Sequence, residues 1–231
     1  MKVIALGDTH GRSFWKLIVH TQAFDKVVFI GDYFDSFNIP AEEQIRNFRE
    51  IVAYKEAHPD KVVLLIGNHD YHYLPVARSI DETYAGFQDR YAFQIGHLIQ
   101  EHRDLLQVCY LWEDYLFSHA GVTQTWLDEV GYKGEEIADF INELFRYKPQ
   151  KFLFNGYDPY GDDVTQSPLW VRPRSLRKDA FHPETIRQVV GHTAMRTLDL
   201  KEDPFFFIDT LETSGEYLII ENGNVRVEKV R

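Results

Sequence analysis

Carboxylate, amide and histidine side chains recur at one kind of place in this chain, directly after a short apolar run and a glycine. The pattern occurs in Gly7-Asp8-Thr9-His10-Gly11, Gly31-Asp32-Tyr33-Phe34-Asp35 and Gly67-Asn68-His69-Asp70. Two later histidines, in Ser118-His119-Ala120-Gly121 and Val190-Gly191-His192-Thr193, also follow apolar runs. Such oxygen and nitrogen donors without thiolates suit Mn²⁺, Fe or Zn²⁺. The spacing therefore predicts a metal centre assembled from separate segments.

Three short apolar runs must position the first three of these segments. Val3–Leu6, Val27–Ile30 and Val62–Ile66 are apolar at every residue, which is typical of strands covered on both faces of a parallel sheet. Between the second and third runs, Ala41–Ala57 has the apolar period of a crossover helix. Since ligands bind at the carboxyl ends of strands in open α/β sheets, the polar residues that follow the runs are expected to converge.

The second half of the chain is predicted to be mainly strand. The expected strands are Leu106–Leu111, Tyr115–Ser118, Phe205–Asp209, Tyr217–Glu221 and Val225–Val230, with a hairpin turn at Asn222-Gly223-Asn224 and one helix at Glu135–Tyr147. A proline-rich stretch at about 148–177 reads as a long ordered surface loop. We therefore predict one α/β domain, residues 1–231, with four layers (αββα): two packed mixed β-sheets flanked by helices.

The charge, the lengths of the apolar runs and the cysteine content of the chain limit the functions to be expected. The formal net charge of −11 repels a nucleic-acid backbone, so long nucleic acids are not expected as partners unless a local cation reverses the sign. The apolar runs are far shorter than the roughly 20 residues of a membrane-spanning helix. The first residues reach the acidic Asp8 too early for a signal peptide, and the single Cys109 cannot form an internal disulfide. These observations predict a cytoplasmic protein without a membrane segment.

The five polar segments together resemble the motifs of the calcineurin-like metallophosphoesterases, over residues 7 to 193. The resemblance implies a sandwich with a two-metal centre at its edge. One metal would be held by Asp8, His10 and Asp32, and the other by Asp32, Asn68, His119 and His192. His69 would be the acid beside the leaving group, and Asp35 would orient His69.

The chemistry expected of such a centre is phosphate-ester or phosphoanhydride hydrolysis. Two divalent ions, Mn most readily and Fe or Zn as alternatives, neutralise the phosphate and lower the pKa of a bridging water. The resulting metal-bridging hydroxide attacks in line, and His69 protonates the leaving oxygen. Asp32, from the central motif, is the candidate for the bridging carboxylate. A phosphorylated small molecule, a nucleotide or a phosphoprotein is the expected substrate.

Departures from the family pattern bear on specificity. Ala194 stands where one branch has a second histidine, which favours the branch of bacterial protein phosphatases and diadenosine tetraphosphatases. That branch usually has Arg-Gly where this chain has Ser36-Phe37, and glutamate where it has Asp70. Without that arginine a phosphate loses a charge-assisted contact. Arg172 first, and Arg12 second, are predicted to replace it.

Other interpretations stay open at this point. A nuclease-like phosphodiesterase would need a basic track, and a non-catalytic protein-binding scaffold of the same fold should have lost ligand residues. The aromatic-rich segment at about 71–104, with Tyr157 and Tyr160, either packs in the core or stacks on an aromatic part of the substrate. No ligand role is assigned to the remaining histidines, which are His20, His58, His72, His97, His102 and His182.

Overall fold

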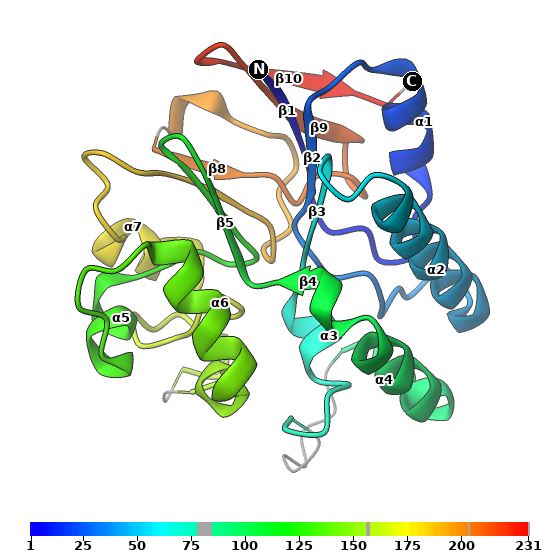
Figure 1. Ribbon diagram of the computed structural model, residues 1–231, viewed down its shortest axis with the longest axis horizontal. Coiled ribbons are helices and arrows are strands. Elements are labelled where there is room, and N and C mark those ends of the chain that lie inside the picture. The colour runs from blue at the N-terminus through cyan, green and yellow to red at the C-terminus, as the bar shows by residue number, and fades with distance from the viewer. Residues whose placement is uncertain (78–84, 156–157, 203, 231) are drawn as a thin grey trace.

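Two β-sheets lie against each other in the middle of the molecule, and helices cover both outer sides (Figure 1). The structure is a computed structural model that describes residues 1–77, 85–155, 158–202 and 204–230. The arrangement confirms the predicted α/β class with two packed mixed sheets flanked by helices. Within the described ranges, no helix has both the length and the hydropathy needed to cross a bilayer.

The larger sheet contains all three apolar runs at its centre. Its strands, in spatial order, are β10 (Asn224–Lys229), β9 (Glu216–Glu221), β1 (Lys2–Leu6), β2 (Lys26–Phe29), β3 (Val62–Leu65) and β4 (Leu106–Gln107). Strands β1 to β4 are parallel, and β9 pairs antiparallel with both β1 and β10. Along β1, Val3 and Ala5 face the other sheet while Ile4 and Leu6 face the helices. Burial on both faces explains why the runs contain no polar residue.

The smaller sheet has the strand order β5 (Cys109–Trp112), β6 (Tyr115–Ser118), β7 (Arg187–Val190) and β8 (Phe205–Phe207). Strands β5 and β6 are antiparallel, and β6, β7 and β8 are parallel. Phe117, Val189 and Phe206 face the larger sheet and pack in one apolar cluster with Val28 and Leu218. This cluster holds the two sheets together.

Helices complete the outer layers. On the side of the larger sheet lie α1 (Phe14–Thr21), α2 (Ala41–Ala57), the short α3 (Asn68–Tyr71) and α4 (Ala92–Glu101), and on the other side lie α5 (Gln124–Val130), α6 (Ile137–Tyr147) and α7 (Pro173–Asp179) (Figure 1). Helix α2 has the predicted bounds, and α6 begins two residues after its predicted start. The apolar stripe of α6 is buried through Ile137, Ile141 and Phe145, as its periodicity indicates.

The predicted strand Leu106–Leu111 is wrong in one respect, because the structure divides it between the two sheets. Its first residues form β4 beside β3, and its last residues belong to β5 beside β6. The chain crosses from one sheet to the other at Val108, where the Asn142 side chain accepts hydrogen bonds from the amides of Val108 and Cys109. Those amides therefore have a partner without a sheet ladder at the crossing.

The predicted loop at 148–177 is also only partly correct, since its described residues include a 3₁₀ turn at Pro149–Phe152 and the start of α7. Both begin with proline, whose fixed φ and missing N–H are compatible with the first turn of a helix. With α5 and α6, these elements make the second half more helical than predicted. The hairpin turn is confirmed: Asn222 and Gly223 have φ of 51° and 78°, as a type I′ turn requires.

The aromatic-rich segment belongs mostly to the core in its described part. Tyr71 and Tyr73 are fully buried, whereas Phe93 is 79% exposed. In the long loop, Tyr160 is 77% exposed. Residues 78–84 and Tyr157 lie outside the described residues. The buried tyrosines favour the core interpretation for this segment.

We expect Phe117→Ala to destabilise the fold strongly, because it opens a cavity between the two sheets. A loss of about 3–5 kcal/mol in the free energy of unfolding is typical of a buried phenylalanine. Phe93→Ala is the matched control and should change this free energy by less than about 0.5 kcal/mol. Urea unfolding of both variants measures the difference, and equal losses would contradict the inter-sheet core.

Candidate metal centre

The predicted donors meet at the carboxyl ends of five strands. Asp8 follows β1, Asp32 follows β2, Asn68 begins α3 after β3, His119 follows β6, and His192 follows β7. One ligand atom each from Asp8, Asp32 and His119 lie within 4.8 Å of one another. Asn68 Oδ1 is 2.8 Å from His119 Nε2 and 2.8 Å from His192 Nδ1. The convergence that the strand pattern predicted is present.

Glycines before the donors permit this close approach. At Gly31, which has a φ of 107°, a Cβ atom would lie 2.4 Å from the backbone nitrogen of Gly67. At Gly191, a Cβ atom would lie 2.0 Å from Asp8 Oδ1. A side chain at either position would therefore push neighbouring loops apart.

Several site residues have an uncommon backbone conformation. His10, Asp32, Asp35 and His192 have φ values of 40°, 51°, 67° and 64°, in the left-handed region that side chains other than glycine rarely adopt. Such strain is stored where the surrounding structure enforces it, and it concentrates at functional sites. At these residues the backbone departs from helix and strand geometry, and its conformation sets the directions of the side chains.

Three histidines each have one ring nitrogen beside a backbone carbonyl, to which its N–H can donate. The other nitrogen faces Asp32 in His10 and His119 and the amide oxygen of Asn68 in His192. The pairs are His10 Nδ1 with Phe34 O at 2.6 Å, His119 Nδ1 with Ile30 O at 3.1 Å, and His192 Nε2 with Trp170 O at 3.0 Å. Burial lowers the pKa of all three imidazoles and so favours their neutral form. Metal-ligating histidines are commonly held in this way.

The donor set fits divalent cations. With Nδ1 of His119 donating to a carbonyl, its Nε2 presents a lone pair to Asn68 Oδ1 and lies 3.4 Å from Asp32 Oδ2. His192 Nδ1 presents a second lone pair to the same amide oxygen. Acceptors that face one another repel unless a cation lies between them. His10 Nε2 is 3.9 Å from the same oxygen, Asp32 Oδ2.

The buried carboxylates lie close to one another, and this favours the binding of cations. Burial raises the pKa of Asp8 well above its usual range, and the nearby charges of Asp209 and Asp32 raise it further. Burial acts in the same direction on Asp32, but the surrounding imidazoles, His119 first, outweigh it and hold the pKa of Asp32 below its usual range. A divalent ion near Asp8 and Asp32 would relieve their mutual repulsion.

Asp70 has a structural role that the sequence pattern did not predict. Its buried carboxylate accepts hydrogen bonds from the backbone N–H groups of Gly67, Asp32 and Tyr33, at 2.9, 2.8 and 2.8 Å. It therefore ties the loop after β2 to the loop after β3. The sequence signal for this role is the carboxylate directly after His69, at the position where the related branch usually has glutamate.

The predicted proton donor lies beside this cluster. His69 Nδ1 is 2.8 Å from Asp35 Oδ2, and the backbone N–H of His69 donates to Asp32 Oδ1 at 2.9 Å. Burial acts to lower the pKa of His69, but the charges of Asp32 and Asp35 outweigh it and raise this pKa to about 9. This shift favours the protonated imidazole at neutral pH.

Two residues without an assigned role also contact Asp35. His72 Nε2 is 2.7 Å from Asp35 Oδ2, and the Tyr73 hydroxyl donates to Asp35 Oδ1. The available sequence signal was spacing, since His69 and His72 are three residues apart and so share one face of a helical turn.

The two predicted substrate-binding arginines differ in their partners. Arg172 donates to Tyr160 O at 2.8 Å, His192 O at 3.2 Å and Thr193 Oγ1 at 3.1 Å, all of which are neutral oxygens. Burial lowers the pKa of Arg172, and Asp32 and Asp8 act against this shift from nearby. Arg12 instead forms an ion pair with Glu212 at 2.5 Å. Arg172 therefore has more positive charge available to a substrate anion.

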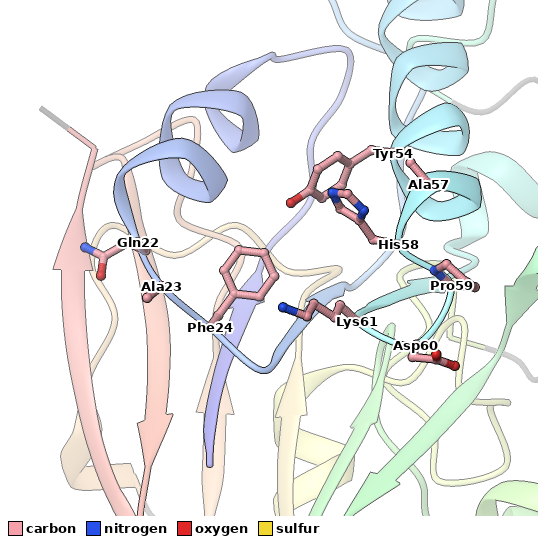
Figure 2. A pocket seen from close by; sticks show the side chains of 9 residues that line it. All are labelled: Gln22, Ala23, Phe24, Tyr54, Ala57, His58, Pro59, Asp60 and Lys61. Carbon is pink, nitrogen blue, oxygen red and sulfur yellow. The ribbon is translucent and has the colours of Figure 1, made fainter.

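A cavity of about 480 Å³ lies near the starts of β2 and β3 (Figure 2), whereas the donors follow the ends of their strands. It is lined by residues that precede β2 and β3, among them Phe24, Tyr54, His58 and Lys61. None of the predicted site residues belongs to this lining. The candidate chemistry is therefore at the carboxyl ends of the strands rather than in this cavity.

The sandwich of two mixed sheets gathers carboxylate, amide and imidazole groups at its strand ends, and these donor types suit divalent cations. The family model described as calcineurin-like phosphoesterase matches residues 1–203. This chain belongs to the calcineurin-like phosphoesterase family. The predicted class, metal-dependent phosphoric ester hydrolase, agrees with this membership.

Individual relatives are distant. A probable serine/threonine-protein phosphatase of Encephalitozoon cuniculi is 25% identical over 185 residues, which cover 76% of this chain and 34% of that protein. The chain therefore spans about a third of the length of this curated relative.

Two solved structures share the fold. A Saccharomyces cerevisiae protein serine/threonine phosphatase with similarity to human phosphatase PP5 has a TM-score of 0.60 at 17% identity, with 99% of this chain and 79% of that chain covered. A metallophosphoesterase from Sphaerobacter thermophilus has a TM-score of 0.56 at 12% identity, with 100% and 89% covered.

We expect Asp32→Ala to abolish stable metal binding, because the imidazoles of His119 and His10 both approach this carboxylate. The unsubstituted protein, loaded with Mn²⁺ and then freed of excess ion, should retain about two equivalents, which elemental analysis measures. Asp60→Ala, an exposed carboxylate beside the distant cavity, is the control and should retain the full amount. Equal metal content in both variants would contradict the shared role of Asp32.

Proposed function

We propose that this protein is a dinuclear metal-dependent phosphoesterase that hydrolyses phosphate esters or phosphoanhydrides. The observation that carries the proposal is the convergence of the imidazoles of His119 and His192 on Asn68 and Asp32, beside His69. A cation-binding centre and a proton donor would then lie within one small region. Family membership supports the same class of reaction.

The proposed ligands follow the two groups of donors around Asp32. Asp8, His10 and Asp32 would hold one ion, and Asp32, Asn68, His119 and His192 would hold the other. We propose Mn²⁺ as the native ion, with Fe or Zn²⁺ also compatible with oxygen and imidazole donors. When bound, two such ions neutralise the phosphate and lower the pKa of a water molecule, which supplies the nucleophile.

Protonation of the leaving group is proposed to depend on His69 and Asp35. His69 would donate its Nε2 proton to the leaving oxygen as the phosphorus–oxygen bond breaks, while the incoming water oxygen forms the new bond in line. Asp35 holds the Nδ1 proton of His69, so that Nε2 faces away from Asp35. Positioned general acids of this kind contribute about 10²–10⁴-fold to rate.

The arginines near the proposed metal centre are the basis for the proposed substrate preference. Arg172 would hold a phosphate oxygen, and Arg12 would assist if Glu212 releases it. A phosphorylated small molecule, a nucleotide or an exposed phosphoprotein site fits this arrangement. The net charge of −11 does not favour a long nucleic acid. The buried free thiol of Cys109 supports the proposal of a reducing, cytoplasmic environment.

We expect the protein to hydrolyse an aryl phosphate monoester in the presence of Mn²⁺, with loss of activity after treatment with a chelator. Comparing p-nitrophenyl phosphate with bis(p-nitrophenyl) phosphate distinguishes monoesterase from diesterase activity. Hydrolysis of neither ester by protein that retains its metal would count against the proposal and in favour of a binding scaffold.

We expect Asp35→Asn to shift the pH dependence of kcat. Asp35 helps to raise the pKa of His69, so removing its charge should lower that pKa. A general acid is lost as pH rises through its pKa, and the alkaline limb should therefore move to lower pH, by about 1–2 units. Profiles of kcat against pH for the two proteins test this. An unchanged alkaline limb would mean that His69 is not the group that titrates there.

We expect Arg172→Ala to raise KM, because it removes a charge-assisted contact worth about 1.5–3 kcal/mol. This corresponds to about a 10- to 100-fold change. Arg174→Ala, whose side chain is 90% exposed, is the matched control and should have an unchanged KM. Metal content should be measured in both variants, since Arg172 also contacts the backbone of His192. A normal KM for Arg172→Ala would exclude Arg172 from substrate binding.

A further inference from the structure

The carboxylate of Asp35 accepts hydrogen bonds from three side chains rather than from His69 alone. Oδ2 lies 2.8 Å from His69 Nδ1 and 2.7 Å from His72 Nε2, and Oδ1 accepts from the hydroxyl of Tyr73. Asp35, His72 and Tyr73 are all buried, so water does not replace these contacts. Such a fully engaged carboxylate has little freedom to rotate.

Local structure brings the donors to Asp35. His69 lies in the single turn of α3, and His72 is the residue that ends this turn. The rings of His69 and His72 meet edge to face, with centroids 5.3 Å apart. Both rings therefore approach Asp35 from the same face of one turn.

The hydroxyl of Tyr73 is held so that its proton points to Asp35. The ring of Tyr73 stacks on Phe87, with centroids 4.7 Å apart and an interplanar angle of 16°. The backbone N–H of Gln88 donates to the Tyr73 oxygen at 2.8 Å. Since the oxygen accepts from Gln88, its own proton is directed to the carboxylate.

Asp35 needs such support because its backbone is unusual. Its φ of 67° is in the left-handed region, and the loop that carries it has no helix or strand to hold it. A small rotation of the carboxylate would turn Oδ2 away from His69 Nδ1. Orientation errors of this size reduce catalytic proton transfer.

We propose that His72 and Tyr73 are positioning residues for the reaction and act through Asp35. They hold its carboxylate in the orientation that His69 Nδ1 meets, and this aims the Nε2 proton of His69 at the leaving oxygen. The role rests on the proposed phosphoesterase function. Its effect is greatest for esters with a basic leaving group, because such a group must be protonated as it departs, whereas an acidic leaving group departs as the anion.

The test compares two monoesters that differ in the leaving group, phenyl phosphate and 2,4-dinitrophenyl phosphate, with Mn²⁺-loaded protein. Tyr73→Phe and His72→Leu should each lose about 10-fold in kcat on phenyl phosphate and less than about 2-fold on the dinitrophenyl ester. His72→Gln keeps an amide N–H near the place of Nε2 and should recover most of the loss. Metal content should equal that of the unsubstituted protein in each variant.

Two further comparisons show whether the effect passes through Asp35. Tyr73→Phe should have no additional effect in an Asp35→Asn background, since the group that it positions is then already altered. Tyr91→Phe removes another tyrosine hydroxyl, which donates to Glu42 at the surface, and should change neither ester. If His72→Leu does not fold, Tyr73→Phe and His72→Gln decide the question.

Equal losses on both esters, losses that follow metal content, or additive effects of Tyr73→Phe and Asp35→Asn would overturn the positioning role and leave His72 and Tyr73 as packing residues. If the unsubstituted, metal-loaded protein hydrolyses neither ester, the phosphoesterase function itself is overturned, and the positioning role with it. These outcomes are distinguishable because the unsubstituted protein is measured first.

Discussion

The structure depends on keeping several buried acceptors close together around Asp32. Its carboxylate faces the imidazoles of His119 and His10, and Asp8 adds a second buried negative charge nearby. Charged and polar groups without compensation are costly to bury. Cations that bind there would supply this compensation, because they would balance the charges of Asp8 and Asp32.

The rest of the fold brings these buried polar groups together and fixes their positions. The two sheets bring strand ends from distant parts of the chain to one edge, and the apolar cluster between them fixes their relative position. The backbone amides of two loops are tied together by Asp70. The net charge of −11 then has a local exception, because bound ions would make this edge attractive to phosphate although the protein as a whole is acidic.

The surroundings of His69 differ from those of His119 and His192. A ring nitrogen of His119 and of His192 meets a backbone carbonyl, and burial lowers the pKa of both imidazoles, whereas His69 meets the Asp35 carboxylate, which helps to raise its pKa. The partner of one ring nitrogen thus differs between the two kinds of histidine. Asp35 in turn contacts His72 and Tyr73, so three side chains surround the carboxylate that His69 meets.

Local patterns in the sequence determined the buried strands, the helices over 41–57 and 137–147, and the polar donors at the strand ends, because periodicity and turn chemistry act over a few residues. Tertiary structure alone decided the rest. The division of 106–111 between two sheets depends on Asn142 from a distant helix, and the partners of Asp70 and Asp35 depend on loops that meet only after the sheets assemble. Contacts between residues far apart in the chain leave no period in the sequence, so neither the crossing nor these hydrogen-bonded carboxylates could be predicted from it.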